Sequence, residues 1–299
     1  MIEIKKVKKS FEDIEAIAGV SLKIKEKTVF GMLGTNGAGK STLLRMMAGV
    51  IKPDAGKILV DGQEVYSSPS AKANCFYVSD EQYYYPSATI RDMERFYRTY
   101  YPGFDRKKFK GFIDQFNLPG NRKIAGFSKG MKKQLSILLG ICSNARYLLL
   151  DETFDGLDPV MRQGVKSIFA SEMEDRSLTP VIASHNLREL EDICDHVGLL
   201  HEGGILLSED LADLKCNLHK VQMVADDYHP DELKDLFDVV QLAVRGRLVT
   251  MTVRGEEPQI ESAVKTLNPV YYELLPLSLE EIFISETEGI GYDIKNIIS

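Results

Sequence analysis

The order of apolar and polar positions indicates an α/β fold in the first part of the chain. Residues 28–50, TVFGMLGTNGAGKSTLLRMMAGV, contain a short apolar run, a glycine-rich turn and a segment of helical period that ends at Gly49. Residues 147–151, YLLLD, form a second apolar run that ends in a carboxylate, as a buried parallel strand can. These elements, in this order, are those of an α/β domain.

The pattern changes after Leu214 and becomes that of a small α+β domain. Val249, Met251 and Val253 alternate with threonines, and Gly246 stands in the turn before them. The predicted strands are residues 221–225, 239–244 and 248–253, and the predicted helices lie around 230–237 and 256–267. We therefore expect a main domain of residues 1–215 and an accessory domain of residues 216–299.

The composition is that of an ordinary globular protein, since 44% of the 299 residues are hydrophobic and 27% are charged. The net charge of −7 argues against a broad surface for nucleic acid or anionic lipid. The four cysteines form no CxxC pair, which indicates free thiols in a reducing cytosol. There is no apolar run near 18 residues and no signal-peptide core. We expect a cytoplasmic protein whose work at a membrane requires a partner.

The glycine-rich turn has the residue pattern of a phosphate-binding loop, G-x-x-x-x-G-K-[ST]. Its glycines let backbone N–H groups converge on phosphate oxygens, Lys40 would reach the β- and γ-phosphates, and the Ser41 hydroxyl would hold Mg²⁺. The alternative is a turn that binds nothing, but the strand before it and the helix after it favour nucleotide binding. The predicted residues are Gly34, Thr35, Asn36, Gly37, Ala38, Gly39, Lys40, Ser41 and Thr42.

Four carboxylates follow the leucine run in LLLDETFDGLD, residues 148–158. Two unit charges about 4 Å apart repel by roughly 4 kcal/mol at an effective dielectric near 20, so such a cluster needs a cation, protonation or divergent side-chain directions. A phosphate loop that supplies one ligand to Mg²⁺ needs an acidic partner on a neighbouring strand, and Asp151 is placed for this. Glu152 is the candidate base, because it could accept a hydrogen bond from the attacking water.

Over residues 2–215 the chain resembles the ATP-binding subunit of an ABC (ATP-binding cassette) transporter. Beyond the two motifs above, FSKGMKKQ at 127–134 resembles the signature sequence of the family, GLD at 156–158 its D-loop, and VIASH at 181–185 its switch histidine. The resemblance implies a P-loop NTPase core with an inserted helical subdomain at about 83–145. It also implies an ATPase of which two copies, or this chain and a paralogue, close on two Mg-ATP and power a separate transmembrane permease.

The resemblance extends to single residues. It implies that Ser128 and Gly130 close over the γ-phosphate held by the opposite subunit, although the residues alone indicate only a helix N-cap at Ser128. It implies that Asp158 reaches across the dimer and that His185 hydrogen-bonds the γ-phosphate and helps Glu152 orient water; we expect Asp155 to be solvated. Phe11 matches the aromatic residue that stacks on adenine, whereas a phenylalanine near a strand is otherwise usually part of a core.

The segment FYVSDEQYYYP, residues 76–86, departs from the family, which generally places a glutamine after this strand to contact Mg²⁺ and water. Asp80 is aligned with that position and can ligate Mg²⁺, while Gln82 follows two residues later. Asp80 is the preferred residue for this position, and Gln82 is the alternative.

Seven of the 13 tyrosines lie between Tyr77 and Tyr101, near Thr89 and Asp92, which have the spacing of a capping box. In the family this region receives a short helix of the membrane subunit, so the rings would form either a docking groove or the core of the subdomain.

The end of the chain, SLEEIFISET, resembles the tail of many bacterial export-type cassettes and favours export. The expected location is the inner face of the cell membrane, through the permease. Competing hypotheses are a soluble ABC-type ATPase and a nucleotide-gated regulator.

Overall fold

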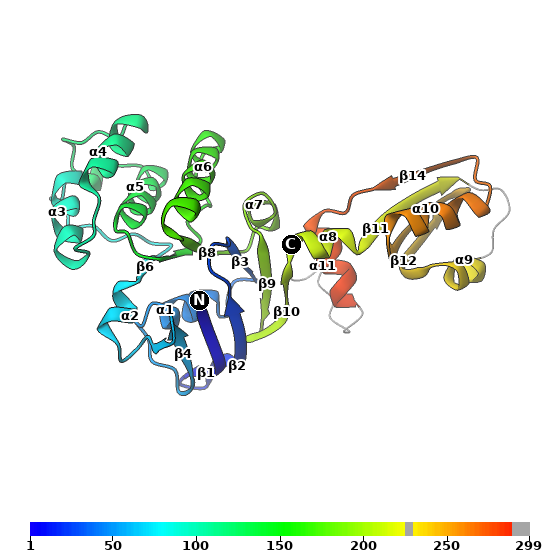
Figure 1. Ribbon diagram of the computed structural model, residues 1–299, viewed down its shortest axis with the longest axis horizontal. Coiled ribbons are helices and arrows are strands. Elements are labelled where there is room, and N and C mark those ends of the chain that lie inside the picture. The colour runs from blue at the N-terminus through cyan, green and yellow to red at the C-terminus, as the bar shows by residue number, and fades with distance from the viewer. Residues whose placement is uncertain (225–229, 289–299) are drawn as a thin grey trace. The chain divides into compact units, whose positions relative to one another are not determined.

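The structure is a computed structural model that describes residues 1–224 and 230–288 (Figure 1). The chain divides into two compact units, Met1–Ser208 and Glu209–Ser299, and each contains a hydrophobic cluster of its own. The boundary expected from the sequence, after residue 215, falls within helix α8 (Leu211–Cys216) of the second unit.

The first unit is built on a six-stranded sheet whose central strands are parallel. Every residue of β3, β7 and β8 is buried, which explains their nearly unbroken apolar sequences. In sheet order the strands are β10 (Gly204–Asp210), β9 (His196–His201), β3 (Phe30–Leu33), β8 (Thr179–Ser184), β7 (Tyr147–Asp151) and β6 (Cys75–Val78).

A second, antiparallel sheet lies in the same unit. Its order is β2 (Ile14–Ile24), β1 (Ile2–Phe11), β4 (Ala55–Val60) and β5 (Gln63–Glu64). One hydrophobic cluster joins the two sheets, with side chains of β1 and β3 packed around α1 (Lys40–Met47). The position of α1 at the carboxyl end of β3 is therefore fixed by burial.

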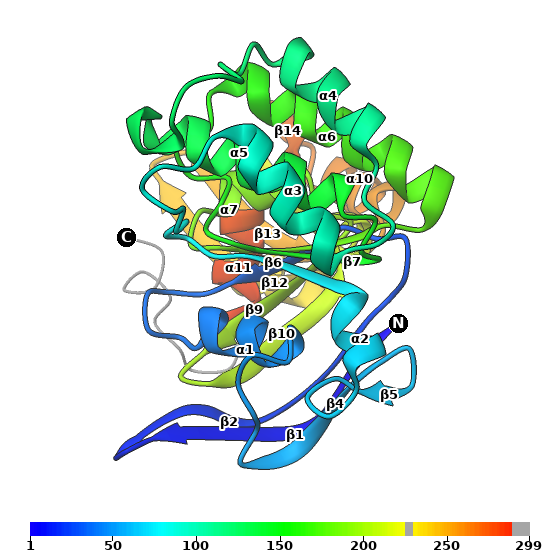
Figure 2. The same ribbon diagram turned by 90° about the vertical axis from the view of Figure 1, so that its left-hand side faces the viewer.

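Helices cover the six-stranded sheet on both sides. Figure 2 shows α3, α4, α5 and α6 on one side, and α1 with the antiparallel sheet on the other. The helices of this unit are α1, α2 (Pro69–Ala73), α3 (Ile90–Tyr100), α4 (Arg106–Gln115), the 3₁₀ turn η1 (Ile124–Gly126), α5 (Lys129–Cys142), α6 (Pro159–Arg176) and α7 (Leu187–Glu191). The arrangement confirms the predicted α/β fold with a helical segment inserted between β6 and β7.

Two predicted helix starts are present in the structure. The hydroxyl of Thr89 accepts a hydrogen bond from the Asp92 N–H, and the Asp92 carboxylate accepts one from the Thr89 N–H, so the capping box at α3 is confirmed. Ser128 caps α5 and accepts from the Met131 N–H at 3.2 Å. Both caps satisfy N–H groups that a helix end leaves unpaired.

The second unit contains a four-stranded antiparallel sheet in the order β12, β13, β11, β14. The element order β-α-β-β-α-β and this strand order are those of a ferredoxin-like domain. The elements are α8, β11 (Leu218–Val224), α9 (Pro230–Leu236), β12 (Asp238–Arg245), β13 (Leu248–Arg254), α10 (Glu257–Thr266), β14 (Tyr271–Leu275) and α11 (Leu279–Glu288).

The sequence located most of this unit. The three expected strands correspond to β11, β12 and β13, and the two expected helices to α9 and α10; residue 225, at the end of the first expected strand, lies outside the described residues. The sequence did not locate β14. None of the helices in the described ranges is both long and apolar enough to span a bilayer.

Candidate nucleotide-binding site

The glycine-rich loop joins the end of β3 to the first turn of α1. Gly37 and Gly39 adopt positive φ values of 86° and 103°, which glycine tolerates and other residues rarely do. A Cβ added to Gly39 would lie 2.5 Å from the Ala16 carbonyl oxygen, and one added to Gly34 would lie 2.5 Å from that of Leu200. Two of the three glycines are therefore required by close backbone packing, whatever the loop binds.

A cavity of about 450 Å³ lies against this loop. The loop contributes residues 35–37 and 39–42, and β2 and the turn after β9 contribute Ile14, Glu15, Ala16, Glu202 and Gly203. Asp80 and Glu152 also line it. Gly34 and Ala38 belong to the loop but do not line the cavity; Ala38 is buried beneath it. The structure thus brings most of the predicted loop residues and two predicted carboxylates to one concavity.

The Lys40 ammonium is nearly enclosed, with 5% of its side chain exposed. It donates to the carbonyl oxygens of Gly34 at 2.6 Å and Thr35 at 3.1 Å, and it lies 3.1 Å from Glu152 Oε1. These oxygens replace the water that the charge loses on burial. The ammonium is consequently placed at the cavity wall and already pairs with an anion.

Asp151, at the end of β7, is joined to the loop by Ser41, whose hydroxyl donates to Asp151 Oδ1 at 2.9 Å. The hydroxyl of Tyr77 donates to Asp151 Oδ2 at 2.8 Å, and Arg45 Nε donates to the Tyr77 oxygen at 3.2 Å. Burial raises the pKa of Asp151, and the hydrogen bonds from Tyr77 and Ser41 oppose that shift because they favour the charged form. The carboxylate is therefore buried with a donor on each oxygen.

The four acids of residues 148–158 diverge. Glu152 points to Lys40 and to His185, whose Nδ1 lies 2.8 Å from Glu152 Oε2, and not to Asp151. Asp155 is exposed. Asp158 caps α6 and accepts from the Met161 N–H at 2.9 Å. The repulsion between the acids is therefore reduced in two ways. Their side chains point in different directions, and Glu152 pairs with the Lys40 ammonium.

The Ser41 hydroxyl and the Asp151 carboxylate fit a magnesium ion. Mg²⁺ usually binds one or two protein oxygens and completes its octahedron with phosphate oxygens and water. Among residues 1–224 and 230–288 no group of three or more His, Cys, Asp or Glu side chains could hold a metal ion without such help. The residues present therefore suit a metal that arrives with a phosphate ligand.

Asp80 and Gln82 lie differently with respect to the cavity. Asp80 lines the cavity, and its Oδ1 lies 3.1 Å from Lys133 Nζ. The Gln82 amide donates to the carbonyl oxygens of Ser79 and Asp80, both at 2.8 Å, and so folds back on its own turn. Of the two residues, Asp80 is the one at the cavity.

Phe11 is not among the residues that line the cavity. It is 44% exposed next to the β1–β2 turn, where Lys9 Nζ lies 5.3 Å from its ring centre. Ile14, just past the turn, lines the cavity instead and is 71% exposed. The sequence favoured the aromatic residue and did not single out Ile14, because the turn decides which side chain reaches the cavity.

Ser128, Gly130 and Asp158 lie outside the cavity of their own chain. A Cβ on Gly130 would come within 3.0 Å of the Gly156 carbonyl oxygen, so the signature segment and the D-loop segment are neighbours. Tyr77 and Lys133, which contact the predicted acids, were not foreseen as site residues. Lys133 lies in FSKGMKKQ and Tyr77 in FYVSDEQYYYP, but neither segment indicates that these side chains reach the acids.

Two of the other histidines make contacts outside the cavity. His196 stacks on Phe30 and bonds to Ser208, and His219 bonds to the Cys216 carbonyl. His229 lies outside the described residues.

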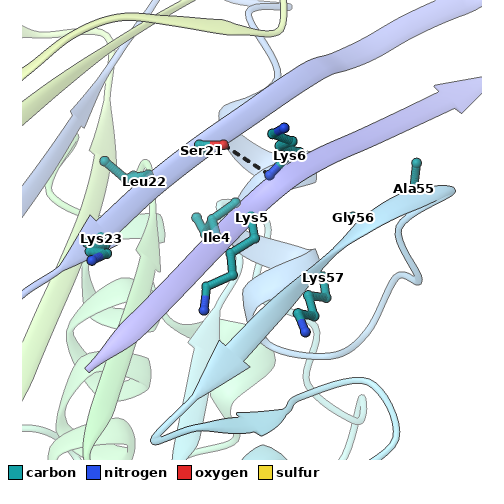
Figure 3. Close-up of a pocket in the computed structure, with 9 residues that line it drawn as sticks. All are labelled: Ile4, Lys5, Lys6, Ser21, Leu22, Lys23, Ala55, Gly56 and Lys57. Carbon is teal, nitrogen blue, oxygen red and sulfur yellow. Dashed lines mark hydrogen bonds between the residues drawn. The ribbon is translucent and has the colours of Figure 1, made fainter.

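A larger concavity of about 990 Å³ lies on the antiparallel sheet, between β1, β2 and β4 (Figure 3). Lys6, in a left-handed conformation with φ of 48°, and Gly56 form an irregularity in the pairing of β1 with β4 there. The lysines of this concavity, Lys5, Lys6, Lys23 and Lys57, are exposed, and none of the phosphate-loop or acidic residues lines it. The predicted phosphate-loop and acidic residues are thus at the smaller cavity.

A buried parallel strand, a glycine-rich loop, a helix that begins at its lysine, and a serine hydrogen-bonded to a strand-end aspartate define a P-loop nucleotide-binding site. The family described as "ABC transporter" matches residues 17–155. The ABC transporter ATP-binding protein YtrB of Bacillus subtilis is 31% identical over 289 residues, which are 97% of this chain and 99% of that protein. The chain belongs to the family of ABC transporter ATP-binding proteins. It is thus an ATPase subunit of the kind the sequence predicted.

More distant relatives and solved structures of ATP-binding cassettes also match this chain. The lipopolysaccharide export system ATP-binding protein LptB of Haemophilus influenzae is 29% identical over 66% of this chain and 86% of its own. The structure of an ATP-binding subunit of an ABC transporter has a TM-score of 0.66 at 22% identity and covers 72% of this chain and 92% of its own. A dimeric cassette bound to ADP and Pi has a TM-score of 0.62 at 22% identity, with 71% and 99% covered. These structures support the fold.

Proposed function

We propose that two cassettes close around two Mg-ATP molecules, hydrolyse them and thereby power a separate transmembrane permease. The observation that carries this proposal is the meeting of Lys40, Ser41, Asp151 and Glu152 at one end of the parallel sheet. The second cassette is another copy of this chain or a paralogue.

The residues divide the work of phosphoryl transfer. Lys40 would leave Glu152 for the β- and γ-phosphates, because a triphosphate offers more negative charge than one carboxylate. Glu152, released from Lys40, would accept a hydrogen bond from the attacking water, and His185 at 2.8 Å would keep its carboxylate oriented. Ser41 and Asp151, with Asp80 as a further oxygen donor, would hold Mg²⁺, which neutralises charge on the phosphates.

Ser128, Gly130 and Asp158 are assigned to the opposite nucleotide. Their position outside their own cavity supports this role, as does the N-terminal end of α5, where free N–H groups favour an anion. Asp158 would give up its cap on α6 to reach the partner. Phe11 remains assigned to the adenine, next to Ile14, although it needs a change of the β1–β2 turn to reach the base.

The permease would dock on an aromatic surface made of Tyr83, Tyr85, Phe96 and Tyr100. These rings are between 36% and 80% exposed and contact one another edge to face or tilted. Tyr84 differs, since its hydroxyl bonds to Ser136 and to the Lys132 carbonyl within the subdomain. Exposed rings with few rotors suit a partner surface.

Export is the proposed direction, with the protein held at the inner face of the cell membrane by its permease. The export-type tail of the sequence supports it, and two relatives have names that refer to export or transport, LptB and the lantibiotic transport ATP-binding protein SrtF of Streptococcus pyogenes.

The test uses Glu152→Gln, which keeps the shape of the side chain and removes the base. We expect ATP affinity to be retained, turnover to fall by about 100-fold or more, and a dimer to accumulate with Mg-ATP in light scattering after size exclusion. The matched control is Glu64→Gln, at an exposed position of β5 outside the cavity, which should keep normal turnover. Normal hydrolysis by Glu152→Gln would contradict the role of Glu152.

A further inference from the structure

Lys133 of α5 connects two residues of the candidate site. Its Nζ donates to the main-chain carbonyl of Glu152 at 2.6 Å and to Asp80 Oδ1 at 3.1 Å. Only 10% of the Lys133 side chain is exposed. Its ammonium has therefore lost most of its water, and these two oxygens replace it.

The hydrogen bond from Lys133 to the Glu152 carbonyl matters because the main chain of Glu152 has an unusual conformation. Glu152 has a φ of 49°, in the left-handed region, which costs a residue other than glycine about 1 kcal/mol or more. Such a conformation persists only where its surroundings hold it. Here the Glu152 N–H donates to the Ala183 carbonyl at 3.0 Å, and the Glu152 carbonyl accepts from Lys133. Both peptide groups of the residue are thus fixed, one by β8 and one by α5.

The second contact places Asp80. Its side chain is 56% exposed at the cavity, and the Lys133 ammonium supplies the positive charge that draws it to α5. One buried cation therefore sets both the backbone of the proposed base and the carboxylate that aligns with the family glutamine.

We propose that Lys133 is a positioning residue for ATP hydrolysis. It holds Glu152 in the left-handed conformation that directs the carboxylate into the cavity, and it keeps Asp80 at the cavity edge. The inference rests on the role proposed for Glu152.

The experiment compares Lys133→Met with Lys132→Met in the full chain. Lys132 is the adjacent, partly exposed residue, and its side chain makes no hydrogen bond or ion pair with any residue that the structure describes. We expect Lys133→Met to lower kcat by about 10- to 100-fold, the effect of removing a residue that orients a site ligand. Binding of a fluorescent ATP analogue with Mg²⁺ and KM should change by less than about threefold. Lys132→Met should leave kcat, KM and the binding of the ATP analogue unchanged.

The same substitution is then made in Glu152→Gln. The part of the effect that Lys133 exerts through Glu152 is absent in this background, so Lys133→Met should lower the residual rate by a clearly smaller factor than it lowers the wild-type rate. An equal fold-loss in both backgrounds would show a general structural effect and overturn the positioning role. If the Glu152→Gln protein with Lys133 unchanged hydrolyses ATP at the wild-type rate, this would instead contradict the role of Glu152 as the base.

Lys133→Arg serves if Lys133→Met does not fold, as judged by circular dichroism. It keeps a buried cation with donors for both oxygens, and kcat should stay within about tenfold of wild type. A larger loss with unchanged binding of the ATP analogue would contradict the proposal.

Discussion

Ser41 and Asp151 are 110 residues apart in sequence, and the hydroxyl of one donates to the carboxylate of the other at 2.9 Å. This hydrogen bond joins the first turn of α1 to the end of β7, and both ends rest on buried apolar strands. Burial favours the protonated acid, so the donors around Asp151 are what keep a charged ligand available for a metal.

Removing the Tyr77 hydroxyl should weaken the use of Mg²⁺. Tyr77→Phe leaves Asp151 Oδ2 without its donor at 2.8 Å, and we expect the Mg²⁺ concentration for half-maximal hydrolysis to rise by about tenfold, as for other residues that orient a metal ligand. The control is Tyr101→Phe, which removes a hydroxyl that donates to the Cys75 carbonyl away from the site. An unchanged Mg²⁺ dependence in Tyr77→Phe would show that Ser41 orients Asp151 alone.

The glycines of the loop should differ in what they tolerate. Gly39→Ala places a Cβ 2.5 Å from the Ala16 carbonyl at a φ of 103°, so we expect nucleotide binding to fall by at least about 100-fold or the protein to lose stability. Gly37 has a φ of 86° but no atom within 4 Å of its added Cβ, and Gly37→Ala should cost less. Titration calorimetry and thermal unfolding measure both. Equal losses would mean that backbone strain, and not the close contact, limits the loop.

The capping box of α3 predicts a stability difference that depends on pH. Hydrogen bonds from the Thr89 hydroxyl and N–H lower the pKa of Asp92. A folded-state pKa below the unfolded value of about 4 stabilises the protein above that pH, and the stabilisation is lost as the pH falls through the folded value. Asp92→Asn should thus lower Tm by about 2 °C at pH 7 and by less in acid.

Asp114→Asn, at an exposed position of α4, is the control for Asp92→Asn. A constant difference in Tm between wild type and Asp92→Asn from neutral to acid pH would show that the charge of Asp92 plays no part in the cap.

The aromatic surface should be separable from the core beneath it. Tyr83→Ala combined with Tyr85→Ala removes two exposed rings, and we expect weaker association with the permease and an unchanged Tm. Tyr84→Ala removes a ring bonded to Ser136 and should lower Tm by several degrees. Co-purification and thermal unfolding report the two effects. If the double variant still associates fully with the permease, the docking site lies elsewhere on the protein.

The parts of the site that sequence reasoning located are those whose residues are contiguous. The phosphate loop is one uninterrupted run, and Asp151 directly ends a run of leucines, so local spacing was sufficient for both. The helix starts at Thr89 and Ser128 were equally local, because a cap is decided within one turn.

The site contacts that the sequence did not predict depend on the packing of elements that are far apart in the chain. Tyr77 reaches Asp151 because β6 and β7 pair in parallel with Tyr77 opposite Leu149, and Lys133 reaches Glu152 through the packing of α5. Phe11 and Ile14 are paired across β1 and β2, next to a register shift between Lys9 and Ser10. Because of this irregularity, the alternation of residues along the strand did not show which of the two side chains lines the cavity. Strand β14 is a sheet edge without a clear alternation.

The most direct test is the binding of ATP measured by titration calorimetry, with Mg²⁺ and with EDTA, for wild type and Asp151→Asn. If the phosphate loop and Asp151 hold Mg-ATP together, wild type binds ATP at least about tenfold more tightly with Mg²⁺, and Asp151→Asn loses that difference. No heat of ATP binding in the wild type, or an equal gain from Mg²⁺ in both proteins, would contradict the account.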